Sequence, residues 1–164
     1  MKTLILYYSE GGSTEDIARK LASEFGGDIE RIDTLKPYPK DEEALVAQGQ
    51  KEAETGFTPE IKPLSHNISD YELIVIGTPT WWYTMAPAVL TLLRSNSFAG
   101  KTVLPFQTHV GQAGHVIPDM RKELRGAMVF SGLRLEFDKY KKLTPASENE
   151  MKQWIDAVKK ELLK

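Results

Sequence analysis

The chain has 164 residues, which suits one domain and is short for two, so we expect residues 1–164 to form a single domain. It contains no cysteine, which excludes a disulfide scaffold, a thiolate metal site and cysteine-based redox chemistry. The 21 Lys and Arg residues nearly balance 23 Asp and Glu residues, and this net charge of -2 gives no indication of a nucleic-acid partner. Any redox activity must therefore come from a bound cofactor.

The sequence gives no signal for export or for a membrane anchor. The apolar run at residues 4–8 is too short for the hydrophobic region of a signal peptide, and no small-residue cleavage site follows it. No segment reaches the roughly eighteen consecutive apolar residues that a membrane helix needs. We therefore expect a cytoplasmic protein without a membrane partner.

Short apolar segments typical of strands alternate with segments of helical periodicity along the whole chain. The predicted strands, in chain order, are residues 4–8, 29–32, 73–76, 102–106 and 129–137, the last interrupted near Gly132. The predicted helices, in chain order, are 17–25, a polar surface helix at 41–54, 87–95, 116–124 and a final helix that begins at Ser147. Residues 55–70 are predicted to be a long loop, which in a compact domain is usually functional or disordered.

Local signals mark where several of these helices begin or end. Gly26 and Gly27 follow the first helix, at a position where a left-handed backbone suits glycine. Pro87 suits a first helical turn, because its missing N–H costs no hydrogen bond there. Ser147 and Glu150 have the S-x-x-E spacing of a capping box, which predicts the start of the last helix.

Strict alternation of strands and helices with right-handed crossovers predicts an α/β fold. The expected architecture is a doubly wound five-stranded parallel sheet of order 2-1-3-4-5, with helices on both faces. In such a sheet ligands bind beyond the carboxyl ends of the strands, at the point where the strand order reverses. The segments after the first, third and fourth strands are therefore the places to look for a functional site.

The segment after the first strand, Ser9-Glu10-Gly11-Gly12-Ser13-Thr14, has the features of a phosphate site. Its two glycines let backbone N–H groups turn inward, its hydroxyls add donors, and the helix that follows adds partial positive charge. The segment contains no Lys or Arg, so dipoles and hydrogen bonds would hold the anion. The structural alternative is a glycine-rich turn with a serine cap.

Other phosphate signatures are missing from the sequence. There is no GxxxxGK[ST] pattern, which excludes a P-loop nucleotide hydrolase, and no GxGxxG pattern after a strand, which excludes a dinucleotide fingerprint. A receiver domain needs acidic residues at the ends of its first and third strands, but these ends read Ser9-Glu10 and Gly77-Thr78, with no paired acids and no acceptor Asp.

Three successive aromatic residues follow the third strand, in Gly77-Thr78-Pro79-Thr80-Trp81-Trp82-Tyr83. Adjacent side chains point in different directions, so the three rings cannot share one core pocket. A flat aromatic ligand would explain at least one ring, because stacking adds about 0.5–1.5 kcal/mol beyond burial. The alternative is that one Trp covers the sheet edge and the other covers a helix.

The segment after the fourth strand, Thr108 to Gly114, again combines a hydroxyl with glycines, Gly111 and Gly114. Its His109 can donate to a carbonyl or to an anionic ring, or it can be an ordinary surface residue. His115 is expected at a helix start and His66 in the long loop. Histidines scattered in this way, without acidic neighbours, do not predict a metal site.

Taken together, these motifs resemble the flavodoxin family, and within it a subgroup whose third loop reads G-x-P-x-W-W. The family's phosphate motif S/T-x-T-G-x-T is similar to residues 9–14, with Gly11 where Thr is usual. The third loop matches as 77–82, and the motif PF-x-T followed by glycines matches as 105–114. Tyr38-Pro39, ahead of the acidic second helix, also fits the subgroup, and the resemblance covers essentially the whole chain.

The resemblance implies that the ligand is FMN. It implies that the phosphate is held by Ser9, Gly11, Gly12, Ser13 and Thr14. It implies that Pro79, Thr80, Trp81, Trp82 and Tyr83 line the isoalloxazine ring, with Trp82 the expected stacking partner. It implies that Thr108, His109, Val110, Gly111 and Gly114 meet the pyrimidine end of the ring.

Two departures from electron-carrier flavodoxins bear on the function. The 108–114 segment carries no aromatic residue, so we expect one face of the ring to be open to a substrate. Electron carriers of the family are strongly acidic, whereas the net charge here is only -2. We therefore expect electron transfer either to a partner protein or to a small quinone-like acceptor, by a monomer or a homodimer. The sequence leaves open whether the protein is a carrier or an FMN-dependent NAD(P)H oxidoreductase, and it identifies no catalytic residue. The alternative function is a small-ligand or anion-binding module without redox activity.

Overall fold

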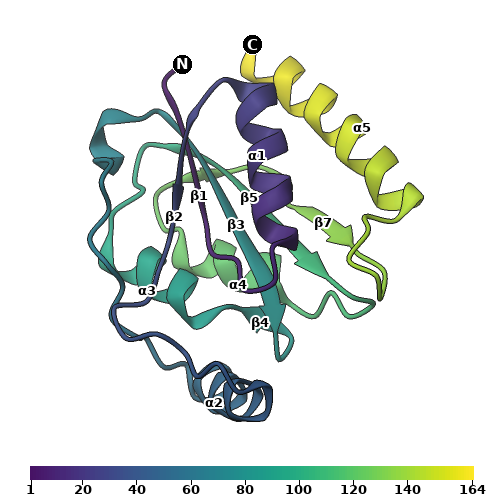
Figure 1. Cartoon of the computed structure of the whole chain (residues 1–164). Helices are drawn as coiled ribbons and strands as arrows, with labels where there is room; N and C mark the ends of the chain where they lie inside the picture. The colour runs from purple at the N-terminus through teal and green to yellow at the C-terminus, as the bar shows by residue number, and fades with distance from the viewer.

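The computed structural model describes residues 1–164, and strands and helices alternate along it (Figure 1). The strands are β1 (Thr3–Tyr7), β2 (Asp28–Arg31), β3 (Leu73–Trp81), β4 (Thr84–Met85), β5 (Thr102–His109), β6 (Met128–Val129) and β7 (Leu133–Glu136). The helices are α1 (Ser13–Phe25), α2 (Glu42–Thr55), α3 (Pro87–Ser95), α4 (Val116–Glu123) and α5 (Pro145–Leu162), with a short 3-10 helix at Ile68–Asp70. None of these helices is long and apolar enough to span a bilayer.

The main sheet is parallel and has the order β2-β1-β3-β5, with β6 and β7 both paired to the outer side of β5. β6 and β7 together take the place of the fifth predicted strand, and the break between them falls at the predicted interruption near Gly132. The predicted order 2-1-3-4-5 is therefore confirmed, because β4 is only a short antiparallel extension of β3.

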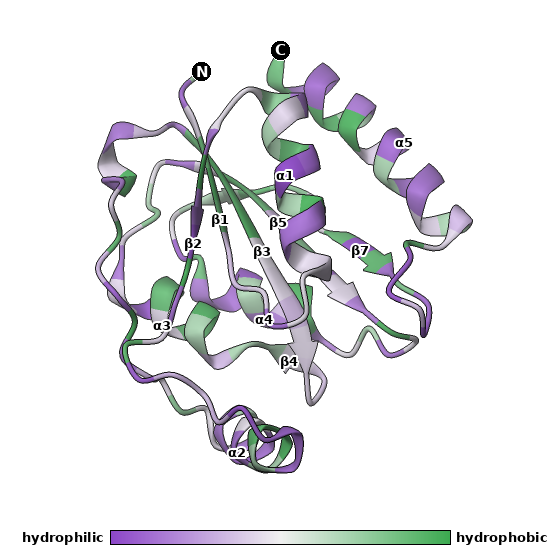
Figure 2. Ribbon diagram, viewed as in Figure 1, coloured by the Kyte–Doolittle hydropathy of each residue, from purple (hydrophilic) through white to green (hydrophobic).

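Alternate residues of the strands enter two hydrophobic cores, one on each face of the sheet. Leu4 and Leu6 of β1 pack with residues of α3 and α4, and Ile5 and Tyr7 pack with residues of α1 and α5. Figure 2 shows the result, with apolar central strands and with helices that turn one apolar side inward. Burial on both faces explains why β1 and β3 read as continuous apolar runs in the sequence.

β3 and β5 are both longer than their apolar runs predict. They stay paired from Leu73 and Thr102 at one end to Pro79 and Thr108 at the other. Residues 77–81 and 108–109, which the sequence places in loops, therefore belong to strands. Gly77 permits this extension, because a Cβ at that position would lie 2.0 Å from Cζ of Phe106.

β3 turns directly into β4 through a two-residue hairpin that the sequence does not predict. Thr80 pairs with Met85 and Trp81 with Thr84, which leaves Trp82 and Tyr83 as the turn. Both turn residues have positive φ, 45° and 69°, a conformation that such turns usually assign to Asn or Gly. Bulky residues in this region cost of order 1–3 kcal/mol each, and strain of this kind concentrates at functional sites.

Helix ends agree with the sequence signals except in α5. α1 ends at Gly26 with φ 69°, and Pro87 occupies the first turn of α3, as predicted. The predicted capping box is wrong: the N-cap of α5 lies three residues earlier, at Thr144, whose side chain accepts from the backbone N–H of Ser147 at 3.2 Å. The Ser147 hydroxyl instead accepts from the N–H of Glu136 at 2.8 Å and so ties α5 to β7.

α2 does not cover the sheet but lies at the end where the carboxyl ends of the strands meet (Figure 1). It packs through Gly49, where a Cβ would lie 3.2 Å from the Trp81 ring and 3.4 Å from the Trp82 ring. The buried Glu52 of α2 accepts a hydrogen bond of 2.6 Å from the Tyr38 hydroxyl. α2 thus supports the β3–β4 hairpin by packing against its two tryptophan rings.

The long loop that follows α2 is tied to the edge of the sheet. The N–H of Leu35 donates to the carbonyl of Glu60, and the N–H of Lys62 donates to the carbonyl of Asp33, both at 2.8 Å. His66, for which the sequence suggests no partner, lies with Nδ1 at 2.6 Å from the Glu30 carboxylate.

Candidate functional site

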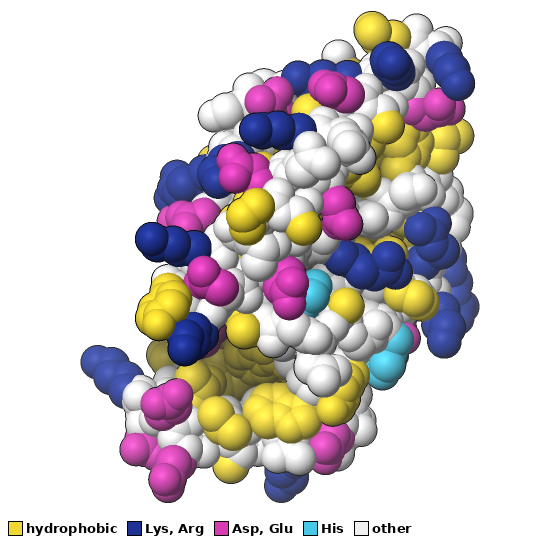
Figure 3. All heavy atoms as spheres, turned by 90° about the vertical axis from the view of Figure 1, so that its right-hand side faces the viewer, with side chains coloured by type: hydrophobic (Ala, Val, Ile, Leu, Met, Phe, Trp, Pro, Cys, Tyr) yellow, Lys and Arg dark blue, Asp and Glu magenta, His cyan; other side chains and the backbone are white.

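A cavity of about 530 Å³ opens at the carboxyl end of the sheet, between β1, β3 and β5. This volume lies within the range of small-molecule sites, roughly 300–1,000 Å³. Figure 3 shows the cavity as a hollow with hydrophobic side chains on its floor. The residues that line it are Glu10, Gly11, Ser13, Thr14, Pro79, Thr80, Trp81, Trp82, Tyr83, Thr108, His109, Val110, Gln112 and Phe137.

The structure brings all three predicted segments to this one cavity. Four of the predicted residues, Ser9, Gly12, Gly111 and Gly114, are not among those that line it. Three lining residues, Glu10, Gln112 and Phe137, are absent from the sequence-based set. Glu10 and Gln112 lie within the predicted segments, whereas Phe137 follows β7 and no motif marks it.

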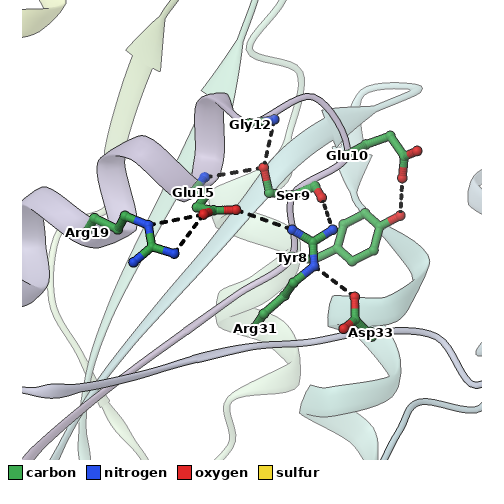
Figure 4. Close-up of polar contacts among 8 residues, drawn as sticks. All are labelled: Tyr8, Ser9, Glu10, Gly12, Glu15, Arg19, Arg31 and Asp33. Carbon is green, nitrogen blue, oxygen red and sulfur yellow. Dashed lines mark hydrogen bonds and ion pairs between the residues drawn. The ribbon is translucent and has the colours of Figure 1, made fainter.

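Ser9 shapes the β1–α1 loop (residues 9–14) from within. Its buried Oγ accepts from the N–H of Gly12 at 3.1 Å and from the N–H of Glu15 at 3.3 Å, as Figure 4 shows. Gly12 has φ 94°, a left-handed conformation that lets the chain turn into α1. Because Ser9 Oγ accepts both bonds, its own O–H proton remains available to a ligand.

The β1–α1 loop also carries backbone donors that no protein group satisfies. The N–H groups of Gly11, Ser13 and Thr14 make no hydrogen bond within the protein. Unsatisfied N–H groups at a helix start carry partial positive charge and bind anions. These three groups fit a phosphate.

Thr14 connects this loop to β5. Its buried Oγ1 lies 2.8 Å from Oγ1 of Thr108, and either hydroxyl can be the donor. When Thr108 donates, the Thr14 proton is free for a ligand in the cavity.

The charged side chains that Figure 4 draws around the loop all have hydrogen-bond partners within the protein. The Glu10 carboxylate accepts from the Tyr8 hydroxyl at 2.7 Å, and burial together with this bond raises the pKa of Tyr8. The Arg31 guanidinium donates to the Ser9 carbonyl and to Asp33, the latter at 2.8 Å. Glu10 therefore turns toward Tyr8, and Arg31 braces the loop through its backbone.

The aromatic residues of the hairpin have different surroundings. The Trp81 ring meets Tyr8 and Tyr38 edge to face, with centroid distances of 5.7 and 5.3 Å. It is half-buried and packs on the core beneath the hairpin. Trp82 lies in the turn against α2, while Tyr83 is 54% exposed at the rim of the cavity. Trp81 therefore acts partly as a structural support, and the turn places Trp82 and Tyr83 at the cavity.

Gly114 allows the loop after β5 (residues 110–114) to pack against the β3–β4 hairpin. A Cβ at Gly114 would lie 2.3 Å from the Tyr83 carbonyl oxygen, so only glycine fits there. The next residue, His115, donates its backbone N–H to the same carbonyl at 2.7 Å. Buried Gln107 donates to the Thr80 hydroxyl at 2.9 Å, and its Oε1 has no partner in the protein.

His109 lines the cavity at the end of β5. Its Nδ1 is buried and has no hydrogen-bond partner in the protein. Burial lowers the pKa of His109 below its ordinary value of 6.5, and nearby Arg134 acts in the same direction, while Glu136 and Glu150 oppose the shift. The ring is therefore neutral at pH 7 and offers one donor and one acceptor.

Metal ligands do not gather anywhere in the described chain. No group of three or more His, Cys, Asp or Glu side chains is placed to hold a metal ion. His115 lies next to Asp119 and His66 next to Glu30, so these two rings are paired with single carboxylates.

The chain belongs to the flavodoxin family, whose pattern it matches over residues 2–158. No curated protein sequence matches it. Among solved structures, a candidate flavoprotein from Bacteroides eggerthii DSM 20697 is 28% identical, with a TM-score of 0.78 over 95% of this chain and 96% of that chain.

Two further structures extend the comparison. A flavoprotein from Lactobacillus acidophilus NCFM in complex with FMN is 26% identical, with a TM-score of 0.69 over 81% of this chain and 92% of that chain. The oxidised flavodoxin 2 from Bacillus cereus is 18% identical, with a TM-score of 0.60 over 98% of this chain and 99% of that chain, and it supports the fold alone.

We predict that His109 titrates below pH 6.5, which a histidine NMR titration of the ligand-free protein measures directly. The unfolded chain binds a proton at His109 near the ordinary pKa, whereas the folded chain binds it only at lower pH. The stability that His109 contributes is therefore present above pH 6.5 and is lost as the pH falls toward the folded pKa. Between about pH 7 and pH 5, His109→Gln should show a smaller loss of unfolding free energy than the wild type. A His109 pKa at or above 6.5 would contradict the prediction.

Proposed function

We propose that this protein binds FMN and transfers electrons to a small quinone-like acceptor. FMN is its cofactor, in agreement with the family and with the FMN complex of the relative from Lactobacillus acidophilus. The observation that carries the proposal is the cavity itself, where unsatisfied donors, an aromatic turn and a polar strand end meet. When bound, FMN supplies the electron chemistry, and the protein supplies binding, orientation and electrostatics.

The β1–α1 loop holds the phosphate in this proposal. The N–H groups of Gly11, Ser13 and Thr14 donate to it, and the hydroxyls of Ser9, Ser13 and Thr14 add further donors. Gly12 contributes by turning the chain, since its own N–H is bonded to Ser9. No Lys or Arg lines the cavity, so dipoles and hydrogen bonds provide most of the attraction.

The flavin ring lies between the hairpin and the end of β5. We assign Pro79, Thr80, Trp81, Trp82 and Tyr83 to one side, with Trp82 as the stacking partner. We assign Thr108, His109, Val110, Gly111 and Gly114 to the pyrimidine side, and the cavity adds Gln112 and Phe137. Neutral His109 can orient the polar edge of the ring through a single hydrogen bond. Gly114 acts indirectly, because it seats the 110–114 loop against Tyr83.

The proposal of a small electron acceptor, in addition to a protein partner, is supported by the open face of the flavin ring. The 110–114 loop carries no aromatic side chain, and Val110 is 69% exposed at the cavity rim. A flat acceptor can lie against this face, with exposed Tyr83 beside it. In this proposal residues 1–164 form one FMN-binding domain of the G-x-P-x-W-W subgroup.

The main test of the proposed function is the reaction with a quinone. FMN-loaded protein, reduced under anaerobic conditions, is mixed with a water-soluble benzoquinone. We expect the flavin absorbance to return with one quinone consumed per flavin, because two electrons and two protons convert one quinone to its quinol. Val110→Trp should slow this step by covering the open face while leaving FMN bound. A reduced protein that does not react with quinones would contradict the acceptor class. An FMN complex that cannot be reduced would support a binding module without redox activity.

We also predict that Thr14→Val weakens FMN binding by about tenfold to hundredfold. A hydrogen bond to a charged group contributes about 1.5–3 kcal/mol, and the variant removes the Thr14 hydroxyl from the phosphate. Titration of the apoprotein with FMN measures the loss. The variant also breaks the hydrogen bond between Thr14 and Thr108. Titration with riboflavin, which lacks the phosphate, measures the effect of that broken bond alone. Equal FMN affinity in the two proteins would exclude Thr14 as a phosphate donor.

A third prediction separates the two tryptophans of the hairpin. A stacked indole quenches flavin emission, so Trp82→Ala should make the holoprotein brighter and weaken FMN. Trp81→Ala should instead lower the free energy of unfolding by about 2–3 kcal/mol, less than the loss for a fully buried aromatic residue. Fluorescence and urea unfolding of both variants provide the measurements. If only Trp81→Ala restores emission, the stacking partner is Trp81.

A further inference from the structure

One lysine from a distant part of the chain reaches the β1–α1 loop. Lys141 lies in the turn between β7 and α5, and its Nζ lies 3.8 Å from the position that a Cβ on Gly11 would occupy. No other atom outside the immediate chain neighbours comes within 4 Å of that position. The ammonium group therefore stands directly beside the loop, in the space that the missing Gly11 side chain leaves open.

Lys141 differs from the other cations near this loop, because it has no anionic partner. Arg19 and Arg31 both pair with Glu15, and Arg31 also pairs with Asp33. The Lys141 ammonium makes no ion pair and no hydrogen bond within the protein. Its positive charge is thus available to an anion at the loop.

The turn that carries Lys141 is fixed by its own hydrogen bonds. The Asp138 carboxylate accepts from the N–H of Tyr140 at 2.8 Å and of Lys142 at 3.0 Å. The backbone N–H of Asp138 also donates to the Lys142 carbonyl at 2.8 Å. Lys141 has φ 61°, a left-handed conformation that a lysine seldom adopts. These bonds hold it there and determine the direction from which its side chain reaches the loop.

We propose that Lys141 is a phosphate-binding residue, which supplies the countercharge that the β1–α1 loop lacks. The proposal rests on the FMN function proposed above and adds a residue that no sequence motif indicates. The loop region carries Glu10, Glu15 and Asp16, so a phosphate dianion there experiences repulsion as well as attraction. An ammonium group has three donors and pairs with phosphate as a compact point charge. Lys141 offsets this repulsion from the open side of the loop.

The test compares Lys141→Gln with Lys142→Gln, a control that removes the same charge from the same turn. Glutamine retains much of the length of lysine and, like lysine, has a Cβ at the left-handed position. Apoproteins are titrated with FMN and with riboflavin at low and at high ionic strength. At low ionic strength we expect Lys141→Gln to weaken FMN by about fivefold to tenfold, and the loss should shrink as salt screens the pair. Riboflavin affinity should stay at the wild-type value, and Lys142→Gln should change FMN affinity less than twofold.

Further variants and outcomes keep the two proposals distinguishable. Lys141→Arg should retain most of the FMN affinity, and thermal unfolding of each variant checks that the turn is intact. If the wild type binds FMN and Lys141→Gln binds it equally tightly, the role of Lys141 is overturned and the FMN function stands. The role is also overturned if Lys141→Gln weakens FMN and riboflavin equally, or if Lys142→Gln is as damaging. If the wild type binds no FMN, the proposed function itself fails and the role of Lys141 fails with it.

Discussion

The extended pairing of β3 with β5 is the constraint on which the rest of the site depends. The two strands remain paired with each other as far as Pro79 in β3 and Thr108 in β5, well beyond their apolar runs. Gly77 makes this possible, because any side chain there would collide with the buried Phe106 ring. The pairing places the β3–β4 hairpin and the end of β5 side by side, and the cavity forms where both meet the β1–α1 loop. A shorter pairing would leave the same residues on separate loops.

The hairpin at the end of β3 combines strain with support from several directions. Trp82 and Tyr83 occupy left-handed backbone positions that cost free energy for bulky side chains. Gly49 of α2 lets that helix approach the tryptophan rings, and Gly114 lets the 110–114 loop approach the Tyr83 backbone. This packing holds the turn in a conformation that its own sequence disfavours. The result is an aromatic surface presented at a fixed place beside the cavity.

The electrostatics of the site depend on which charged side chains have partners in the protein and which line the cavity. Arg31 pairs with Glu15 and Asp33, whereas the Glu10 carboxylate accepts a hydrogen bond from the neutral Tyr8 hydroxyl. The cavity wall itself contains no Lys or Arg. Backbone N–H groups at the start of α1 therefore provide the main attraction for an anion, and Lys141 adds a charge from outside the wall. Burial lowers the pKa of His109, so its ring offers one hydrogen-bond donor and one acceptor without adding a positive charge.

The sequence by itself determined the alternation of elements, the strand order and the three segments that form the site. It could do so because apolar periodicity and glycine positions are local signals, and the parallel topology brings the ends of the strands to one edge. Only the tertiary structure decided where β3 and β5 end, since pairing across strands extends them beyond their apolar runs. It also revealed Phe137 at the cavity and Lys141 beside Gly11. Both lie far from the motifs along the chain and come near them only because β7 pairs with β5.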